Sequence, residues 1–234
     1  MENPSIRRAW LGQADCRHCA IRHMVLFSQL GEHDFDHIHR PVDELQLEPG
    51  HTLYRQGETA TALYTLRGGI IKLAQYAADG TQRIVRLLRS GDVIGLEALV
   101  NQPYSHDAVV LQRAILCRLP LDLVRRLDRE SPPVHQELMR RWQHALSEAD
   151  AWLTQLSTGS ARVRVARLLM RIADPSGHAC NLLTREDMGA MLGITMETAS
   201  RTVAAFRREG AIRGDDGQNL QCDVDKLREI TGEI

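Results

Sequence analysis

Aromatic side chains are scarce in this sequence, at 4% of its 234 residues, so a core must rest on aliphatic side chains. No run approaches the roughly 18 apolar residues of a membrane helix. The formal net charge of -1 excludes a uniformly basic nucleic-acid binder but leaves room for a local basic surface. The start of the chain also lacks the apolar segment of a secretory signal. We therefore expect a cytoplasmic protein that does not bind membranes.

The sequence also lacks the short motifs of several large enzyme classes. It contains no Gly-x-x-x-x-Gly-Lys-[Ser/Thr] phosphate loop, no Gly-x-Ser-x-Gly elbow and no Gly-x-Gly-x-x-Gly fingerprint. Its 43% hydrophobic and 25% charged residues are typical of a globular chain that can bury a core. We therefore expect no enzyme. A β-sandwich enzyme with a helical appendage is the alternative from a different class.

Short β-rich runs recur between residues 45 and 120, separated by turn residues such as Pro49-Gly50, Gly68-Gly69 and Gly91-Asp92. Many short strands at a spacing of roughly 8 to 12 residues are typical of an antiparallel sandwich or barrel. Asp79-Gly80, between two such runs, is the sharpest hairpin signal. The predicted strands are Thr52–Tyr54, Leu63–Leu66, Ile70–Tyr76, Ile84–Leu88, Val93–Ile94, Val109–Leu111 and Ile115–Leu119.

From Pro132 onward the apolar residues follow a helical period. Spacings that alternate between four and three residues connect six apolar side chains, as at the a and d positions of a coiled coil. These residues are Leu138, Trp142, Ala145, Ala149, Trp152 and Leu156. Such a seam suits a contact between two helices and predicts a homodimer interface. A buried amphipathic helix within one chain is the alternative.

The C-terminal part of the chain predicts two short helices followed by a hairpin. Thr184 to Asp187 opens a helix with a capping pattern, and Gly193 ends that helix. Thr195 can cap a second helix that runs from Met196 to about Arg208. Two helices joined by a short turn around a glycine are typical of a helix-turn-helix. The turn sequence Gly214 to Gly217 predicts a hairpin that completes a winged helix.

Side chains on the second helix suit contacts with DNA. Glu197, Ser200 and Arg201 are spaced to share one helix face, and the first turns of a recognition helix face base edges. Arginine can bond bidentately to guanine, glutamate can accept from cytosine, and serine can bond several bases. Arg207 and Arg208 suit phosphates. The sequence therefore predicts binding to double-stranded DNA. A plain helical hairpin with a solvated charged face is the alternative.

The chain resembles the CRP/FNR superfamily of bacterial transcription regulators over nearly its whole length. The resemblance covers the β-rich segments Gly50–Gly57, Leu66–Lys72 and Ser90–Gly95, the long helix and the winged helix. Its most specific part, Thr195-Met-Glu-Thr-Ala-Ser-Arg201, looks like the FNR-type signature. The residues expected to contact DNA are Thr195, Glu197, Thr198, Ser200, Arg201, Arg207 and Arg208.

The resemblance implies an α+β fold and four successive parts. A cysteine-containing N-terminal segment spans 1–40, and an antiparallel β-roll sensor domain, similar to cyclic-nucleotide-binding domains, spans 41–130. A long dimerisation helix spans 131–158, and a winged helix-turn-helix DNA-binding domain spans 159–234. The resemblance further implies a homodimer on a palindromic TTGAT-like operator, with RNA polymerase as a second partner.

The resemblance also bears on whether cyclic AMP binds. In cAMP-type members an arginine commonly precedes the recognition-helix glutamate, whereas this chain has Met196. Those members hold the cyclic phosphate with a Gly-Glu-Leu turn and an Arg-Ser pair, whereas this chain has Gly95-Leu96-Glu97 and Ser105-His106. A largely neutral histidine is a poor substitute for a charged guanidinium on a phosphate. We therefore expect no cAMP binding.

The cysteines imply a different signal. FNR-type oxygen sensors hold an iron–sulfur cluster with three N-terminal cysteines and a fourth in the β-roll. Cys16 and Cys19 match the first two and Cys117 the β-roll position, but Val25 stands at the third. A cluster normally needs four thiolates, so His23 becomes a candidate donor. The resemblance implies a regulator that responds to oxygen or redox state through this set.

Several alternatives for the signal stay open. Cys16 and Cys19 can form a dithiol switch instead. The cysteines can also have no chemistry, with Cys117 a core residue of a strand. A regulator of the same fold that responds to a cyclic nucleotide, haem or nitric oxide is a further alternative.

Overall fold

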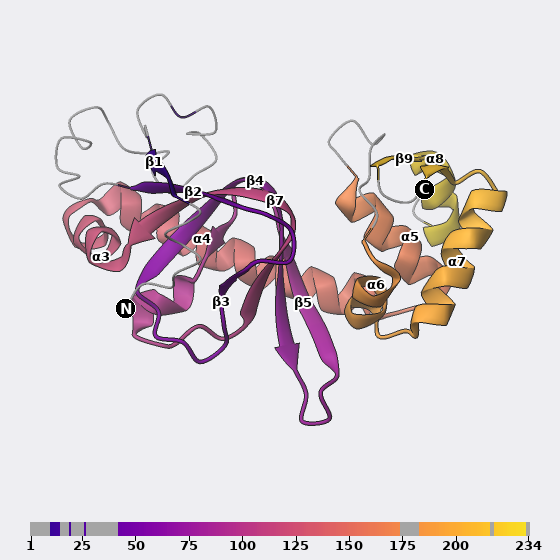
Figure 1. Ribbon diagram of the computed structural model, residues 1–234, viewed down its shortest axis with the longest axis horizontal. Coiled ribbons are helices and arrows are strands. Elements are labelled where there is room, and N and C mark those ends of the chain that lie inside the picture. Colours follow the sequence, from indigo (N-terminus) through magenta and orange to yellow (C-terminus); the bar gives the residue numbers. More distant parts are fainter. Residues whose placement is uncertain are drawn as a thin grey trace. The chain divides into compact units, whose positions relative to one another are not determined.

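The structure, a computed structural model, describes residues 10–14, 19, 26, 42–173, 183–215 and 218–232. The chain divides into two compact units (Figure 1). The first comprises residues 1–75 and 86–147, and the second comprises 76–85 and 148–234. Within the described part, no helix combines the length and apolar character needed to cross a membrane.

An antiparallel sheet dominates the first unit. Its strands run in the order β1-β2-β7-β4-β5, with β3 also paired to β7 and β6 to β4. Their bounds are β1 (Trp10–Gln13), β2 (Asp43–Leu47), β3 (Thr52–Tyr54), β4 (Ala62–Tyr76), β5 (Gln82–Leu88), β6 (Val93–Ile94) and β7 (Asp107–Pro120). The expected antiparallel β domain is confirmed.

The prediction that Gly68-Gly69 separates two strands was wrong. Both glycines lie inside the 15-residue strand β4, and the register against β7 shifts at this point. Gly69 has a φ of +88°, and a Cβ there would lie 2.3 Å from the carbonyl oxygen of Arg113. The glycine pair therefore lets β4 bulge against β7 without ending it. Two other predicted strands likewise merge into β7.

The core of the first unit is aliphatic, as the scarcity of aromatic residues predicts. The 3₁₀-helix η2 (Leu96–Val100), helix α3 (Leu121–Glu130) and the first part of α4 (Pro132–Ala151) contribute to it. The buried side chains that meet there include Leu63, Leu119, Leu123, Leu127 and Leu138. At its C-terminal end α4 continues into a π-helical turn, η3 (Trp152–Leu156).

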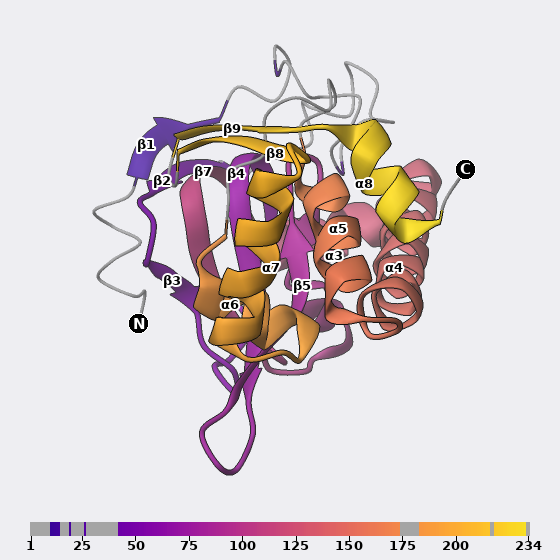
Figure 2. The same cartoon turned by 90° about the vertical axis from the view of Figure 1, so that its right-hand side faces the viewer.

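The second unit contains a helix-turn-helix and a two-stranded hairpin, as predicted (Figure 2). Its helices are α5 (Ala161–Ile172), α6 (Arg185–Leu192), α7 (Met196–Arg208) and α8 (Val224–Thr231). The hairpin pairs β8 (Ile212–Asp215) with β9 (Gln218–Cys222). Helix α5 contacts α6, α7 and α8, so it forms the centre of this unit.

Candidate DNA-binding surface and sensor site

The turn between α6 and α7 depends on two glycines. Gly193 ends α6 with a φ of +62°, a conformation that disfavours other residues. A Cβ at Gly189 would lie 2.8 Å from the carbonyl oxygen of Ile194, so this close approach of helix and turn requires a glycine. Local sequence therefore sets how the recognition helix α7 begins.

Helix α7 presents one face to solvent and one to the unit's core. Its Ala199, Val203 and Phe206 are buried, whereas Glu197 and Arg201 are exposed. Ser200 is also exposed. Hydrogen bonds from its own backbone N–H and from Thr195 lower the pKa of Glu197, with a smaller effect from Arg201. The exposed face therefore offers an ionised carboxylate, a hydroxyl and a guanidinium, the groups expected to read base edges.

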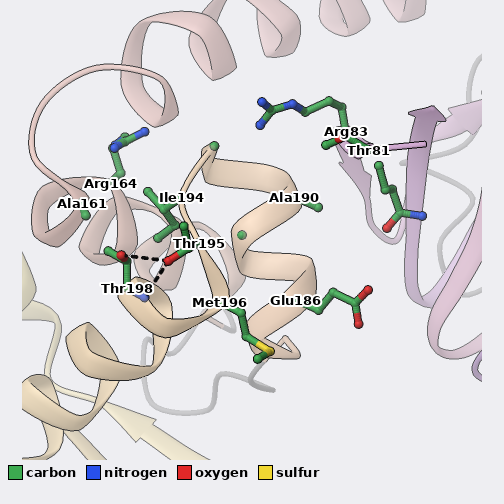
Figure 3. Close-up of a pocket in the computed structure, with 13 residues that line it drawn as sticks. Thr81, Arg83, Ala161, Arg164, Glu186, Ala190, Ile194, Thr195, Met196 and Thr198 are labelled. Carbon is green, nitrogen blue, oxygen red and sulfur yellow. Dashed lines mark hydrogen bonds between the residues drawn. The ribbon is translucent and has the colours of Figure 1, made fainter. Parts of the chain in front are cut away.

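Two threonines of the predicted set also build the start of α7 (Figure 3). The Thr195 hydroxyl accepts a hydrogen bond from the Thr198 backbone N–H over 3.2 Å. The two hydroxyl oxygens lie 3.1 Å apart. Thr195 is exposed and Thr198 is half-buried. Both hydroxyls therefore already take part in hydrogen bonds at the start of α7 when no DNA is bound.

The arginines of the second unit divide into structural and exposed groups. Arg208 is exposed at the end of α7, whereas Arg207 is half-buried. Arg162 forms a bidentate pair with Glu209, and its guanidinium lies 4.9 Å from the centre of the Phe206 ring. The Arg162 hydrogen bond lowers the pKa of Glu209. The pair lies 47 residues apart in sequence, which is why sequence reasoning missed it.

An open pocket of about 630 Å³ lies beside the helix-turn-helix within the second unit (Figure 3). Met196 and Glu186 line it, together with Arg83 and Arg164. Arg164 donates to the carbonyl oxygen of Leu192, so this guanidinium satisfies the C-terminal end of α6. The start of the recognition helix therefore borders open space.

In the first unit, the segment that corresponds to a cyclic-phosphate site contains a carboxylate. Glu97 on η2 accepts a hydrogen bond from the Ser105 backbone N–H over 3.0 Å. Burial lowers the pKa of His106, Glu97 raises it by a smaller effect, and Arg86 lowers it further. Beside them the rings of Tyr54 and Tyr104 stack with centroids 3.7 Å apart.

Two of the predicted cysteines, Cys19 and Cys117, both interact with the guanidinium of Arg67. Cys117 is buried on β7, opposite Glu44 on β2 and Thr65 on β4. Arg67 pairs with the Glu44 carboxylate and bonds the Cys117 sulfur. Burial lowers the pKa of Arg67, but Glu44 and the sulfurs of Cys117 and Cys19 raise it above its usual value overall. The half-buried Cys19 therefore acts electrostatically on the guanidinium that contacts Cys117.

The rest of the proposed metal set lies outside the described residues, namely Cys16 and His23. Among the residues that are described, no group of three or more Cys, His, Asp or Glu side chains could hold a metal ion. Cys19 and Cys117 supply two thiols, whereas a cluster normally needs four thiolates. The described residues therefore fit part of such a site.

The predicted dimer seam divides between buried and exposed positions. Leu138, Trp152 and Leu156 are buried within the chain's own fold, and Ala145 and Ala149 are half-buried. Trp142 is exposed. The other exposed large hydrophobic side chains of this segment are Met139, Leu146 and Leu153. The apolar face that remains open on α4 is therefore rotated by about one residue from the predicted seam.

Comparisons with known proteins agree with this architecture. A family model of the cyclic nucleotide-binding domain matches residues 44–131, and one of the Crp-like helix-turn-helix domain matches residues 163–230. The chain is 26% identical to the regulatory protein HlyX of Actinobacillus pleuropneumoniae over 224 residues, which cover 92% of each chain. It is 25% identical over 210 residues to the fumarate and nitrate reduction regulatory protein of Salmonella typhi, covering 85% of this chain and 84% of that one.

A solved structure has a similar overall fold to this chain. FixK2 from Bradyrhizobium japonicum matches with a TM-score of 0.72 at 22% identity, covering 81% of this chain and 96% of that one. The curated relatives named above are regulatory proteins rather than enzymes. The expectation that this chain is not an enzyme is thereby confirmed.

Proposed function

The chain belongs to the CRP/FNR superfamily of transcription regulators, and on this premise we propose that it binds a palindromic, TTGAT-like operator as a homodimer. The observation that carries the proposal is the exposed face of α7, where Glu197, Ser200 and Arg201 stand together above a buried Ala199-Val203-Phe206 stripe. A two-fold dimer would bring two such helices to half-sites about one helical turn apart.

Two arginine variants test this function. Arg201→Ala should cost about 1–3 kcal/mol on the operator and relax the choice at one G·C pair. Arg208→Ala is the matched control, because loss of a phosphate contact should weaken all sequences alike. Fluorescence anisotropy at several salt concentrations measures both effects on operator and random duplexes. Equal losses on the two duplexes for Arg201→Ala would contradict a base-reading role.

The second copy of the chain is proposed to pack on the open face of α4. Met139, Trp142 and Leu146 are 48%, 37% and 58% exposed, at spacings of three and four residues. Exposed large apolar side chains in this heptad spacing suit a self-complementary contact across a two-fold axis. RNA polymerase as a further partner and a cytoplasmic location belong to the same proposal.

The signal is proposed to be oxygen or redox state, sensed through the cysteines. The hydrogen bond of Arg67 with the Cys117 sulfur, and the electrostatic effect of Cys19 on the same guanidinium, support this proposal. If an iron–sulfur cluster is bound, Cys16, Cys19, Cys117 and His23 would hold it, and hydrogen bonds to its sulfurs would tune its potential. Arg67 would then compensate thiolate charge and donate to one sulfur.

The test is protein prepared without oxygen, analysed for iron, acid-labile sulfide and visible absorption. Wild type should contain both elements, and Cys117→Ser together with His23→Ala should lose them. Absence of iron and sulfide from wild type, or their persistence in Cys117→Ser, would refute the cluster. If oxidant still altered DNA binding and Cys16→Ser abolished that response, a dithiol switch would replace it.

A further inference from the structure

Two arginines on α5 hold the end of the long helix that carries the proposed dimer face. Arg171 donates a hydrogen bond to the Glu148 carboxylate over 2.8 Å, and its guanidinium lies 5.9 Å from the centre of the Trp152 ring. One turn earlier, Arg167 donates to the backbone carbonyl oxygen of Gln155 over 3.0 Å. All three partners belong to the same compact unit as α5. The end of α4 and the turn η3 are therefore attached to the central helix of the DNA-binding unit.

These contacts fall where the long helix departs from α-helical geometry. The turn η3 is π-helical, a rare form that often occurs at functional sites. Its Trp152 is buried and lies beneath the guanidinium of Arg171. The next residue, Leu153, is exposed and lies seven residues after Leu146 of the open apolar face. Adjacent residues of one turn therefore meet α5 and the surface proposed for the partner copy.

The strength of the attachment comes from several contacts of one side chain. The side chains of Arg171 and Glu148 are 24% and 39% exposed, and an ion pair at a surface contributes little when it stands alone. The Arg171 guanidinium also lies over the Trp152 ring and donates to the side-chain oxygen of Gln155 over 3.5 Å. Because one planar group contacts a carboxylate, a ring and an amide, it fixes the orientation of η3 on α5.

A fixed attachment limits which DNA sites a dimer can use. One base pair added between two half-sites moves one of them by about 3.4 Å and rotates it by about 35° around the DNA axis. A recognition helix joined rigidly to the two-fold interface cannot follow both changes, whereas a loosely joined helix can. We propose that Arg171 is a positioning residue that sets the half-site spacing accepted by the dimer, an inference that rests on the proposed DNA binding as a homodimer.

The experiment varies the spacing of the operator. The wild-type protein first selects its operator from a random duplex pool, and duplexes with one base pair more or fewer between the half-sites are then compared by fluorescence anisotropy. The wild type should bind the selected spacing at least about tenfold more tightly than either altered spacing. Arg171→Met keeps a long side chain without its charge, so this ratio should fall to about threefold or less. Its affinity for a duplex with a single half-site should equal that of the wild type.

A second variant and a matched control complete the test. Glu148→Gln removes the same ion pair from the side of α4 and should also lower the spacing ratio, so it decides the matter if Arg171→Met does not fold. Arg228→Met is the control, because Arg228 pairs with Asp225 on its own helix. It should keep the wild-type ratio. Thermal unfolding and sedimentation check that each variant is folded and dimeric.

The outcomes that contradict the inference differ from those that contradict the proposed function. An unchanged spacing ratio in folded, dimeric Arg171→Met, or an equal fall in Arg228→Met, would overturn the role of Arg171. A wild type that binds all three spacings equally would do the same. A wild type that selects no palindrome would instead refute the proposed function itself.

Discussion

The backbone N–H of Ser105 donates a hydrogen bond to the carboxylate of Glu97 over 3.0 Å. Glu97 lies on η2 and is the last residue of Gly95-Leu96-Glu97, the stretch that stands where cyclic-nucleotide regulators have their phosphate-binding turn. A backbone N–H that would suit an anionic phosphate is therefore already bonded to an anionic side chain of the same chain. A bound cyclic phosphate would have to displace this carboxylate or lie beside its like charge.

We therefore predict that cyclic AMP does not stabilise the protein. A ligand that binds only the folded state raises the unfolding midpoint as its concentration increases. Millimolar cAMP should leave the midpoint unchanged in a thermal unfolding experiment, and calorimetric titration should show no saturable heat. A midpoint that rises and saturates with cAMP would contradict the prediction, despite the match to the cyclic nucleotide-binding family model.

The neighbouring His106 predicts a dependence of stability on pH. Its pKa is lowered from 6.5, chiefly by burial, so the folded state binds a proton less readily than the unfolded state. The stability associated with neutral His106 is therefore fully present above pH about 6.5 and is lost as the pH falls toward the lowered pKa. His106→Gln should flatten the decline of unfolding free energy below that pH, as measured by urea denaturation. An unchanged slope would contradict the assignment.

Much of the DNA-binding unit follows from local sequence. The Thr184 hydroxyl accepts the Asp187 backbone N–H, the Thr195 hydroxyl accepts that of Thr198, and Gly193 ends α6 in a left-handed conformation. Each of these interactions spans four residues or fewer and uses residue types with a strong preference for that position. The helix-turn-helix was therefore predictable from the sequence without knowledge of its tertiary contacts.

Other features depend on residues that are distant in sequence. The bulge at Gly69 exists because Arg113, on another strand, lies against it, and a glycine pair alone looks like a turn. A heptad spacing also cannot choose between two adjacent seams on α4. The predicted seam and the open face of α4 both contain Trp142 and Ala149. Because Leu138 packs into the core, the apolar residues next to the predicted seam are the ones that stay exposed. Packing between residues distant in sequence therefore determines which apolar face of α4 is exposed, and the heptad spacing alone does not.

The open face of α4 predicts which substitutions break the proposed homodimer. Leu146→Glu should place like charges opposite each other across the two-fold axis and yield monomers in sedimentation experiments. Gln143→Glu is the control, because it adds the same charge at another exposed position of the same helix. It should leave the dimer intact. A dimer that persists in Leu146→Glu, or that dissociates equally in both variants, would exclude this face as the interface.

The close approach at Gly189 predicts that a single methyl group disables DNA binding. A Cβ at this position would lie 2.8 Å from the carbonyl oxygen of Ile194, a backbone atom that can move only if the turn between α6 and α7 moves. Alanine has a helix propensity about 1 kcal/mol better than glycine, whereas overpacking costs about 1–3 kcal/mol. We therefore expect Gly189→Ala to lower the free energy of unfolding modestly, by at most about 2 kcal/mol.

The effect of Gly189→Ala on operator affinity should exceed its effect on stability. The displaced turn carries Thr195 and the start of α7, and a base contact fails when its helix shifts by a fraction of an ångström. Gly68→Ala is the control, because a Cβ added to that glycine would meet nothing within 4 Å. It should keep wild-type operator affinity. Urea denaturation measures the stability of both variants, and fluorescence anisotropy measures their operator affinity. Wild-type operator affinity in Gly189→Ala would show that the turn tolerates the methyl group.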